Sequence, residues 1–369
     1  MNKIRVLVVD DSTVIRRLVT EALASDPQIE VVGTAADGKI ALAKIPLLKP
    51  DVITLDIEMP QMNGLETLVH LRRDHPRLPV IMFSTLTERG AAATLDALSR
   101  GASEYVTKPA NVGSVTAAIK TVREELLPKI KALAAAGHGR SRLTARGTQP
   151  LVRATMARPA INQRVDIVAI GVSTGGPNAL AEVIPRLPAS LPVPIVIVQH
   201  MPPIFTKHLS DRLNHLSPLN VAEAVAGEEL IPGKVRLAPG GKHLIIRRFG
   251  ARVVTDLNEH APENSCRPAV DVLLRSVVDV YGAGTLSVIL TGMGQDGLLG
   301  SRRVREVGGQ VVAQDQATSV VWGMPGAVAQ DGLAQSVLPL DKIAEEIERL
   351  VQIARAQSRS SFAITEKSC

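Results

Sequence analysis

The sequence predicts an α/β protein with two domains, each built on a mostly parallel sheet that helices cover on both faces. Short runs of β-branched and aliphatic residues alternate with segments of helical periodicity along most of the chain. Aromatic residues make up 2% of the sequence and hydrophobic residues 45%, so the cores consist of aliphatic side chains, which suits buried parallel strands. The length of 369 residues suits two or three domains.

The first region, about residues 4–121, contains five such strand runs. Ser12 can cap the helix after the first of them, because apolar residues at helical spacing follow it directly. The strands are predicted at 4–9, 29–34, 51–56, 79–85 and 104–107, and the second helix at 38–48. Strands that alternate with helices in this way predict a parallel sheet with both faces covered.

Residues 122–162 differ in composition and are predicted to be a linker. The fifth helix runs on through Leu126, and the stretch AAAGHGRSRLTARGTQP that follows is rich in small and basic residues. This segment contains much of the excess of basic over acidic residues that gives the formal charge of +6, with few acids beyond Glu124 and Glu125. We therefore do not interpret the charge as a nucleic-acid footprint, although such a linker can touch acidic partners.

A second α/β region is predicted over residues 163–355. Its strands are DIVAIG, VPIVIVQH, TLSVIL and GGQVVAQD, and VRLAPGGKHLII with ARVVTD is predicted to form a hairpin. A closing helix spans residues 341–354. The last residues, 356–369, are polar and are predicted to be disordered.

Cysteine usage and the absence of long apolar runs indicate the compartment. The two cysteines, Cys266 and Cys369, form neither a zinc spacing nor a disulfide framework, which fits a reducing cytosol. The N-terminus reaches two aspartates before a signal-peptide apolar region is complete, and no run of ~18 apolar residues occurs. We therefore expect a cytoplasmic protein that neither inserts into a membrane nor binds nucleic acid.

Carboxylates and a lysine follow successive strands of the first region. These are Asp10 and Asp11, Asp56, and Lys108, with Thr85 after the fourth strand. Because the carboxyl ends of parallel strands meet at one edge of a sheet, the three acids converge there, and Mg²⁺ suits such hard oxygen ligands. Asp56 can attack phosphorus to form an aspartyl phosphate, whose oxygens Thr85 and Lys108 can contact. A single such acid is more often a helix cap, so the prediction depends on the whole set.

The motifs VLVVDDS, DVITLDIEMPQMNGLE, FST and VTKP resemble the receiver domain of two-component response regulators over residues 4–121. The resemblance implies a flavodoxin-like fold, Mg²⁺ dependence and phosphotransfer from a histidine kinase to Asp56. It also implies that Tyr105 is the aromatic residue that couples phosphorylation to an output surface.

A serine, a histidine and an aspartate follow strands of the second region. Residues 171–175, GVSTG, fit the G-x-S-x-G pattern between a strand and a helix, which makes Ser173 a candidate nucleophile. His200 ends a strongly apolar strand, and Asp296 lies in the loop after another. A serine needs an adjacent base, and that base needs an acceptor that fixes its tautomer. This order along the chain is not that of the α/β-hydrolase, chymotrypsin or subtilisin families.

Three other interpretations remain open from the residues alone. GVSTGG also resembles a dinucleotide fingerprint, but His200 stands near the place where such a site needs an acid. A DNA-binding response regulator would need a C-terminal helix-turn-helix or winged domain, which the strand-rich second region does not suggest. An inactive scaffold or phosphate sink would keep the triad as a vestige. Among the other histidines, only His243 is a candidate for lining a pocket.

Six motifs resemble the catalytic domain of the chemotaxis protein-glutamate methylesterases over about residues 163–355. They are GVSTGGPNAL, VIVQHMPPIFT, LAPGGKHL, CRPAVDVLLRSV, LTGMGQDGLLG and QVVAQDQATSVVWGMPGAV. The resemblance implies Ser173 as nucleophile, His200 as general base and Asp296 as its orienter, with backbone N–H groups near Thr174 and Met293 as oxyanion donors. It implies a doubly wound, mostly parallel, Rossmann-like sheet with an added antiparallel hairpin, and no cofactor for ester hydrolysis.

Together the two resemblances imply a phosphorylation-controlled enzyme that hydrolyses glutamate γ-methyl esters on methyl-accepting chemotaxis receptors and releases methanol. Deamidation of receptor glutamines would follow from the same chemistry. The implied partners are a chemotaxis histidine kinase and the receptors, with the linker as hinge. Gln316, Trp322 and Gly326 depart from the residues usual in the family.

Overall fold

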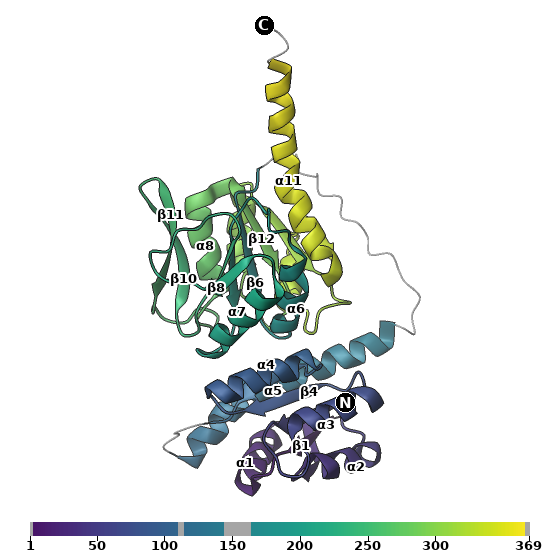
Figure 1. Ribbon diagram of the computed structural model, residues 1–369. Coiled ribbons are helices and arrows are strands. Elements are labelled where there is room, and N and C mark those ends of the chain that lie inside the picture. Colours follow the sequence, from purple (N-terminus) through teal and green to yellow (C-terminus); the bar gives the residue numbers. More distant parts are fainter. Residues whose placement is uncertain (1–2, 110–113, 144–163, 366–369) are drawn as a thin grey trace. The chain divides into compact units, whose positions relative to one another are not determined.

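The computed structural model describes residues 3–109, 114–143 and 164–365 (Figure 1). The chain divides into two compact units, Met1–Thr148 and Gln149–Cys369. Each unit is a sheet with helices packed on it, as the alternation of strand and helix patterns predicts.

The first unit is a five-stranded, all-parallel sheet in the order β2-β1-β3-β4-β5. This order and the covering helices confirm the predicted flavodoxin-like architecture. The strands are β1 (Ile4–Val9), β2 (Ile29–Ala35), β3 (Val52–Asp56), β4 (Val80–Ser84) and β5 (Glu104–Thr107). The helices are α1 (Thr13–Ala24), α2 (Gly38–Leu48), α3 (Gly64–Asp74), α4 (Glu88–Ser99) and α5 (Val115–Leu143).

Local sequence signals explain where the helices of this unit begin. Ser12 accepts a hydrogen bond from the N–H of Ile15 and caps α1, as predicted. Asn63 and Glu66 form a reciprocal capping box at the start of α3. Gly64 follows because a Cβ there would lie 2.1 Å from the carbonyl oxygen of Asp56, so α3 begins directly against the end of β3.

Helix α5 extends well into the segment predicted as a linker. Leu126 and Ile130 are completely buried and Leu133 nearly so, although Pro128 lies within the helix. The predicted boundary at residue 121 therefore falls inside a packed helix, because apolar residues at helical spacing continue past it. Residues 144–162 of the predicted linker lie outside the described residues.

The second unit contains a seven-stranded sheet in the order β14-β13-β12-β6-β7-β9-β8, with every neighbouring pair parallel. A separate antiparallel pair, β10-β11, completes the predicted doubly wound fold. The strands are β6 (Ile167–Val172), β7 (Ile195–Gln199), β8 (Asn220–Glu223), β9 (Lys234–Leu237), β10 (His243–Phe249), β11 (Arg252–Asn258), β12 (Thr285–Ile289), β13 (Gln310–Gln314) and β14 (Ser336–Leu338). The helices are α6 (Gly176–Val183), α7 (Phe205–Leu216), α8 (Val270–Tyr281), α9 (Leu298–Glu306), α10 (Met324–Gln330) and α11 (Leu340–Thr365), with short 3-10 turns at Ile184–Arg186 and Gly282–Gly284.

The hairpin is smaller than predicted. VRL, the first part of the predicted hairpin segment, is β9 and pairs in parallel with β7 in the main sheet. Only β10 and β11 pair with each other, because the chain turns between β9 and β10 at Pro239 and at Gly241, whose φ is 78°. The short strands β8 and β14 were not predicted, because each has few buried residues and little alternation.

Helix α11 is also longer than predicted. Ile343, Ile347, Leu350 and Val351 are buried along its inner face, as the periodicity predicts. The prediction of disorder from residue 356 is wrong as far as Thr365, because no Gly or Pro interrupts the sequence after Leu340 and the helix continues. Residues 366–369 lie outside the described residues. None of the described helices combines the length and the apolar character needed to cross a membrane.

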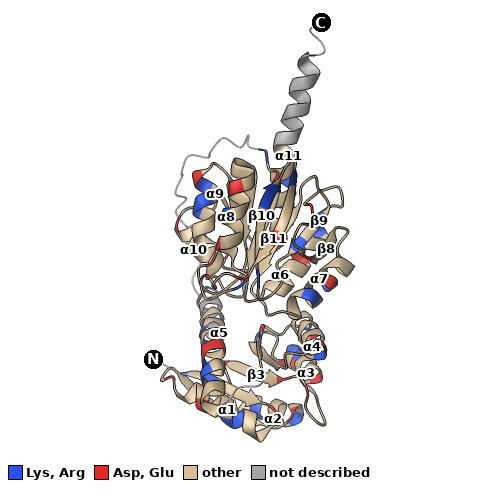
Figure 2. Cartoon of the chain, turned by 90° about the vertical axis from the view of Figure 1, so that its left-hand side faces the viewer, with Lys and Arg blue, Asp and Glu red and all other residues tan. Residues whose placement is uncertain are grey.

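Charged residues of both signs occur together on most helices. Figure 2 shows Lys and Arg interleaved with Asp and Glu within each unit. Many form ion pairs along one helix, such as Lys207 with Asp211 in α7 and Arg303 with Glu306 in α9. This pattern is that of a solvated surface.

Candidate functional site

The predicted acids of the first unit meet at the carboxyl ends of β1 and β3, where the strand order reverses. One carboxylate oxygen from each of Asp10, Asp11 and Asp56 lies within 4.8 Å of the others. Lys108 Nζ lies 2.9 Å from Asp10 Oδ2 and 2.8 Å from Asp56 Oδ2. Within the described part of the chain, neither of these two buried oxygens has another hydrogen-bond partner. Three carboxylates against one ammonium leave net negative charge and free oxygens, which fits a divalent cation such as Mg²⁺.

Asp56 is buried at the end of β3, and its environment opposes ionisation. Burial raises the pKa of Asp56 to about 6, and the nearby charge of Asp10 acts in the same direction. Lys108 and the N–H of Ile57, which donates to Asp56 Oδ1 at 2.7 Å, act in the opposite direction. Burial also acts to lower the pKa of Lys108, but its contacts with Asp56 and Asp10 outweigh this effect and raise it. Lys108 therefore stays charged beside the acids.

Two hydroxyl groups lie at the end of β4. The predicted residue, Thr85, is exposed, and its hydroxyl hydrogen-bonds to that of Thr87. Ser84 is buried at the last position of β4, directly after Phe83, which pairs with Asp56 across the sheet. Sequence reasoning missed Ser84, although its place as the last residue of an apolar strand was the available signal.

Tyr105 is buried in β5, and helix α5 holds it in place. Lys129 Nζ donates to the carbonyl oxygen of Tyr105 at 2.7 Å and lies 5.1 Å from the centre of its ring. The same ammonium lies 3.8 Å from Oε1 of the Glu104 carboxylate. Burial raises the pKa of the Tyr105 hydroxyl well above its usual value. The predicted switch residue is thus connected to the helix that leads out of the unit.

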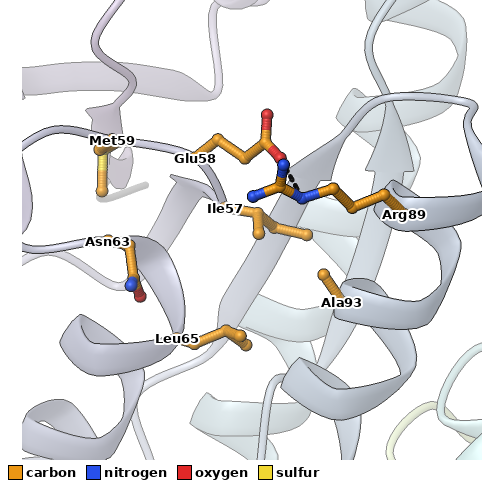
Figure 3. A pocket seen from close by; sticks show the side chains of 7 residues that line it. All are labelled: Ile57, Glu58, Met59, Asn63, Leu65, Arg89 and Ala93. Carbon is orange, nitrogen blue, oxygen red and sulfur yellow. Dashed lines mark ion pairs between the residues drawn. The ribbon is translucent and has the colours of Figure 1, made fainter.

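A cavity of about 580 Å³ begins at Ile57, the residue after Asp56 (Figure 3). An ion pair between Glu58 and Arg89, with 3.3 Å between Oε1 and Nε, crosses it. Both side chains are exposed, so the pair is worth little to stability and can open. The remaining lining residues are Met59, Asn63, Leu65 and Ala93.

In the second unit, Ser173, His200 and Asp296 follow three adjacent strands, β6, β7 and β12. The sheet order reverses between β6 and β12, which is where doubly wound sheets hold their ligands. Ser173 follows β6, and its N–H donates to the carbonyl oxygen of Thr291 at 3.0 Å. Gly175, with φ of 77°, turns the chain into α6. The strand–turn–helix context predicted for the serine is therefore present.

His200 and Asp296 form a hydrogen-bonded pair. Nε2 of His200 lies 2.8 Å from Oδ2 of Asp296, and both side chains are largely buried. A carboxylate can only accept, so the proton of this bond belongs to Nε2, and Nδ1 is the nitrogen that can act as a base. The N–H groups of Val270 and Asp271, at the start of α8, also donate to Asp296 at 2.7 and 3.0 Å. The positive end of a helix thus faces the carboxylate.

The environment of the pair favours its charged forms. Burial alone acts to lower the pKa of His200, but the hydrogen bonds to Asp296 and Cys266 outweigh it and raise the pKa to about 9. Burial alone acts to raise the pKa of Asp296, but His200 and the N–H groups of α8 lower it. His200 must therefore lose a proton before it can act as a base at neutral pH.

Ser173 and His200 follow two paired strands, and the N–H of His200 donates to the carbonyl oxygen of Val172 at 3.2 Å, but no hydrogen bond joins the two side chains among the described residues. Nδ1 of His200 instead lies 3.5 Å from Sγ of Cys266. Gln199 Nε2 donates to the carbonyl oxygens of Ser173 at 3.0 Å and of His200 at 3.3 Å. This buried amide connects the backbones of the two residues, and sequence reasoning missed it because Gln199 was taken only as the end of a strand.

The predicted oxyanion donors are available for hydrogen bonding. In the part of the chain that is described, neither the N–H of Thr174 nor that of Met293 donates to a protein group. Thr174 follows Ser173, and Met293 follows Gly292, where a Cβ would lie 2.8 Å from Cβ of Ser173. N–H groups without a protein acceptor near a serine suit an oxygen that gains negative charge.

The other singled-out residues have structural roles. His243 is buried, with its Nε2 at 3.1 Å from the carbonyl oxygen of Ala261 and its Nδ1 accepting from the N–H of Ala269, so both ring nitrogens are engaged by the backbone. Trp322 packs on Gly326, where a Cβ would lie 3.0 Å from its ring, and its indole N–H donates to the carbonyl oxygen of Gln314. Two of the three departures from the family pattern, Trp322 and Gly326, therefore lie in contact with each other.

Comparisons with known proteins find a matching family for each of the two units. A family model described as CheB methylesterase matches residues 168–347, and one described as response regulator receiver domain matches residues 6–120. A protein-glutamate methylesterase/protein-glutamine glutaminase of Trichodesmium erythraeum is 51% identical over 354 residues, which are 95% of this chain and 100% of that protein. A protein of the same name from Nocardioides sp. is 52% identical over 360 residues, which are 95% of this chain and 96% of that protein.

A solved structure resembles the second unit. The crystal structure of the Thermotoga maritima CheB methylesterase catalytic domain is 48% identical in sequence and superimposes with a TM-score of 0.50. The match covers 51% of this chain and 99% of that domain. The seven-stranded sheet of the second unit is not the helix-turn-helix or winged domain that a DNA-binding response regulator needs.

Proposed function

Because the chain belongs to the family of CheB-type protein-glutamate methylesterases/protein-glutamine glutaminases, we propose that it hydrolyses glutamate γ-methyl esters on methyl-accepting chemotaxis receptors, releases methanol, and is controlled by phosphorylation of its receiver domain. The observation that carries the proposal is the buried His200–Asp296 pair beside Ser173, at a topological switch point. Such a pair is what a serine needs in order to become a nucleophile.

The reaction follows from the positions of these groups. Ser173 attacks the ester carbonyl, and Nδ1 of His200 takes the hydroxyl proton because Nε2 is engaged by Asp296. The N–H groups of Thr174 and Met293 donate to the oxyanion. His200 returns the proton to the leaving methanol, and water then hydrolyses the acyl-enzyme. With a receptor glutamine the same steps release ammonia, which makes the enzyme a deamidase as well.

The receiver part supplies the control. Asp56 accepts a phosphoryl group from a chemotaxis histidine kinase, and Lys108 contacts the phosphate together with a hydroxyl at the end of β4, from Thr85 or Ser84. Asp10, Asp11 and Asp56 would hold Mg²⁺, which neutralises charge on the transferred group when it is bound.

The signal then leaves through Tyr105 and helix α5. We assign residues 4–143, up to the end of α5, to the receiver and residues 163–355 to the catalytic domain, with the hinge between them. Residues 356–369 form a C-terminal extension that α11 enters. The exchange with kinase and receptors takes place in the cytoplasm.

Methanol release from methylated receptor membranes tests the proposal. The wild type is compared with Ser173→Ala, with Asp56→Asn and with Ser99→Ala, an exposed serine of the first unit that serves as the control. We expect release to need Ser173 and to rise with a small phosphodonor and Mg²⁺ only when Asp56 is present. Equal release by wild type and Ser173→Ala contradicts the nucleophile. Phosphodonor-stimulated release that survives in Asp56→Asn contradicts the control.

The inactive-scaffold interpretation makes a different prediction. A serine-directed phosphonate should label the wild type at Ser173, because the adjacent base activates that hydroxyl. A scaffold with a vestigial triad would leave Ser173 unlabelled while Asp56 still accepts phosphate.

A further inference from the structure

The loop between β11 and α8 contains a tight turn in an unusual backbone conformation. Asn264 and Ser265 both have positive φ, 52° and 61°, a region that disfavours residues with a side chain. Two backbone hydrogen bonds close the turn, from Glu263 N–H to the carbonyl oxygen of Cys266 at 3.1 Å and from Cys266 N–H to that of Glu263 at 2.8 Å. Strain of this kind is kept where the surrounding structure requires it, and it is common at functional sites.

Asn264 uses this conformation to reach the carboxylate of the catalytic pair. Its Nδ2 donates to Oδ1 of Asp296 at 2.9 Å and to Oδ2 of Asp271 at 3.0 Å. Both acids are almost fully buried, and burial together with the charge of Asp296 raises the pKa of Asp271. A neutral amide between two buried carboxylates therefore holds them apart and fixes the oxygen of Asp296 that does not face His200.

Cys266, two residues later, reaches the other end of the same pair. Its Sγ lies 3.5 Å from Nδ1 of His200, while Nε2 is held by Asp296. Nδ1 is the nitrogen that must accept the proton of Ser173. The thiol occupies a hydrogen-bonding position on this nitrogen, and a thiol forms only weak hydrogen bonds, so a serine hydroxyl can replace it at little cost.

We propose that the turn formed by residues 263–266 positions the catalytic pair, with Asn264 fixing the carboxylate of Asp296 and the Cys266 thiol holding Nδ1 of His200 until the hydroxyl of Ser173 replaces it. This inference rests on the proposed esterase function. Asn264 and Cys266 are positioning residues, because they act through Asp296 and His200 and not on the substrate. The titratable groups that face the imidazole are Cys266 from the turn and Asp296, with Asp271 of α8 behind Asn264.

Kinetics of the full-length enzyme test the role of the thiol. Cys266→Ala is expected to lower kcat about tenfold with KM unchanged, because the imidazole is then held at one nitrogen only and reaches the reactive orientation less often. The alkaline rise of the pH–rate profile should move to lower pH, since a partner of the imidazolium is lost. Cys266→Ser should restore most of both quantities. Ser190→Ala is the control, because this exposed serine lies in the second unit outside the turn and should leave kcat and the profile unchanged.

Asn264 is tested in the same way. Asn264→Ala should lower kcat, again without a change in KM, and Asn264→Gln should not restore it because the longer side chain cannot meet both carboxylates. Wild-type kcat and pH profile in both Cys266→Ala and Asn264→Ala, with Ser173 and His200 still essential, would overturn the inference and leave the esterase intact.

A measurement that needs no ester substrate separates this inference from the proposed function. In Cys369→Ala, which leaves Cys266 as the remaining cysteine, the rate of alkylation by iodoacetamide is followed by mass spectrometry near pH 7. Sγ lies 3.5 Å from Nδ1 of His200, and the imidazole can accept the proton that the thiol loses when it attacks the reagent. His200→Gln should therefore slow alkylation of Cys266 at least fivefold. Methanol release that fails while alkylation still depends on His200 counts against the esterase function alone. An alkylation rate that is the same with and without the imidazole of His200 counts against the thiol–imidazole contact.

Discussion

Replacing Asp296 by Asn tests the assignment of Nδ1 as the base. In the wild type, Oδ2 of Asp296 accepts a hydrogen bond from Nε2–H of His200 at 2.8 Å and another from the N–H of Val270 at 2.7 Å. Oδ1 receives the N–H of Asp271 and of Gly297, each at 3.0 Å. An asparagine has only one acceptor oxygen, and we expect this oxygen to occupy the Oδ1 position, where it accepts the hydrogen bonds of the donors there. Its NH₂ group then faces His200 and donates to Nε2, which moves the imidazole proton to Nδ1 and removes the base.

The size of the effect follows from this change of tautomer. Holding a catalytic histidine in the wrong tautomer costs about 10⁴ in kcat. At about 1.4 kcal/mol for each factor of ten, this is about 5.5 kcal/mol of transition-state stabilisation. The N–H of Val270 is left facing an NH₂ group, and one buried donor without a partner costs about 1–3 kcal/mol of folding free energy. The variant should therefore fold but be less stable.

The assay is the initial rate of methanol release at saturating methylated receptor, measured together with thermal unfolding. Asp331→Asn is the control, because this exposed aspartate of the same unit forms a surface ion pair of 2.9 Å with Arg302. It should retain wild-type kcat. If Asp296→Asn folds and retains more than a tenth of wild-type kcat, the Nε2–Asp296 bond does not set the tautomer and the reasoning is wrong.

Three further predictions concern pH, the receiver and stability. Because the pKa of His200 is raised to about 9, kcat/KM should rise about tenfold per pH unit below that value, and a profile that levels off near pH 7 contradicts this. Ser84→Ala should reduce the ratio of rates with and without phosphodonor more than Thr85→Ala does, since Ser84 carries the buried hydroxyl at the end of β4. A larger effect of Thr85→Ala would instead assign the phosphate contact to Thr85. The contact with Arg236 lowers the pKa of Glu228 to about 2, so its contribution to stability is present above pH 4.5 and is lost as pH falls toward 2. Glu228→Gln should destabilise the protein by about 2 kcal/mol at pH 7, with little difference near pH 2 in denaturant titrations.

The sequence predicted most of the sheet because parallel strands here are continuous aliphatic runs. Strands β1 and β5 were predicted at their observed bounds, and β6 and β7 within one or two residues. The segment VRL was assigned to the wrong strand pair, because the local sequence of a short strand does not determine whether it pairs within the main sheet or within a hairpin. Its position in the main sheet depends on the pairing with β7, which is distant in sequence. The length of α11 was underestimated because polar composition was taken as a sign of disorder where the helix pattern continued.

The site was predictable where residues stand at the ends of strands and less so where they reach in from loops. Ser173, His200 and Asp296 follow adjacent strands, and a periodicity argument finds such positions. Asn264 and Cys266 come from a turn between a hairpin and a helix, and no spacing along the chain indicates that they meet His200 and Asp296. Such contacts depend on backbone dihedral angles that local residue preferences oppose.

The packing of Trp322 on Gly326 constrains how this chain can have diverged. A Cβ at position 326 would lie 3.0 Å from Cε3 of the indole, so a side chain there requires the ring of Trp322 to shift. The indole is in turn held by the hydrogen bond from its N–H to the carbonyl oxygen of Gln314, so a shift of the ring would weaken that bond. A side chain at 326 therefore costs more beside a tryptophan at 322 than it would beside a smaller aromatic residue. The two positions are energetically coupled, and we expect a replacement at one to be tolerated best together with a replacement at the other.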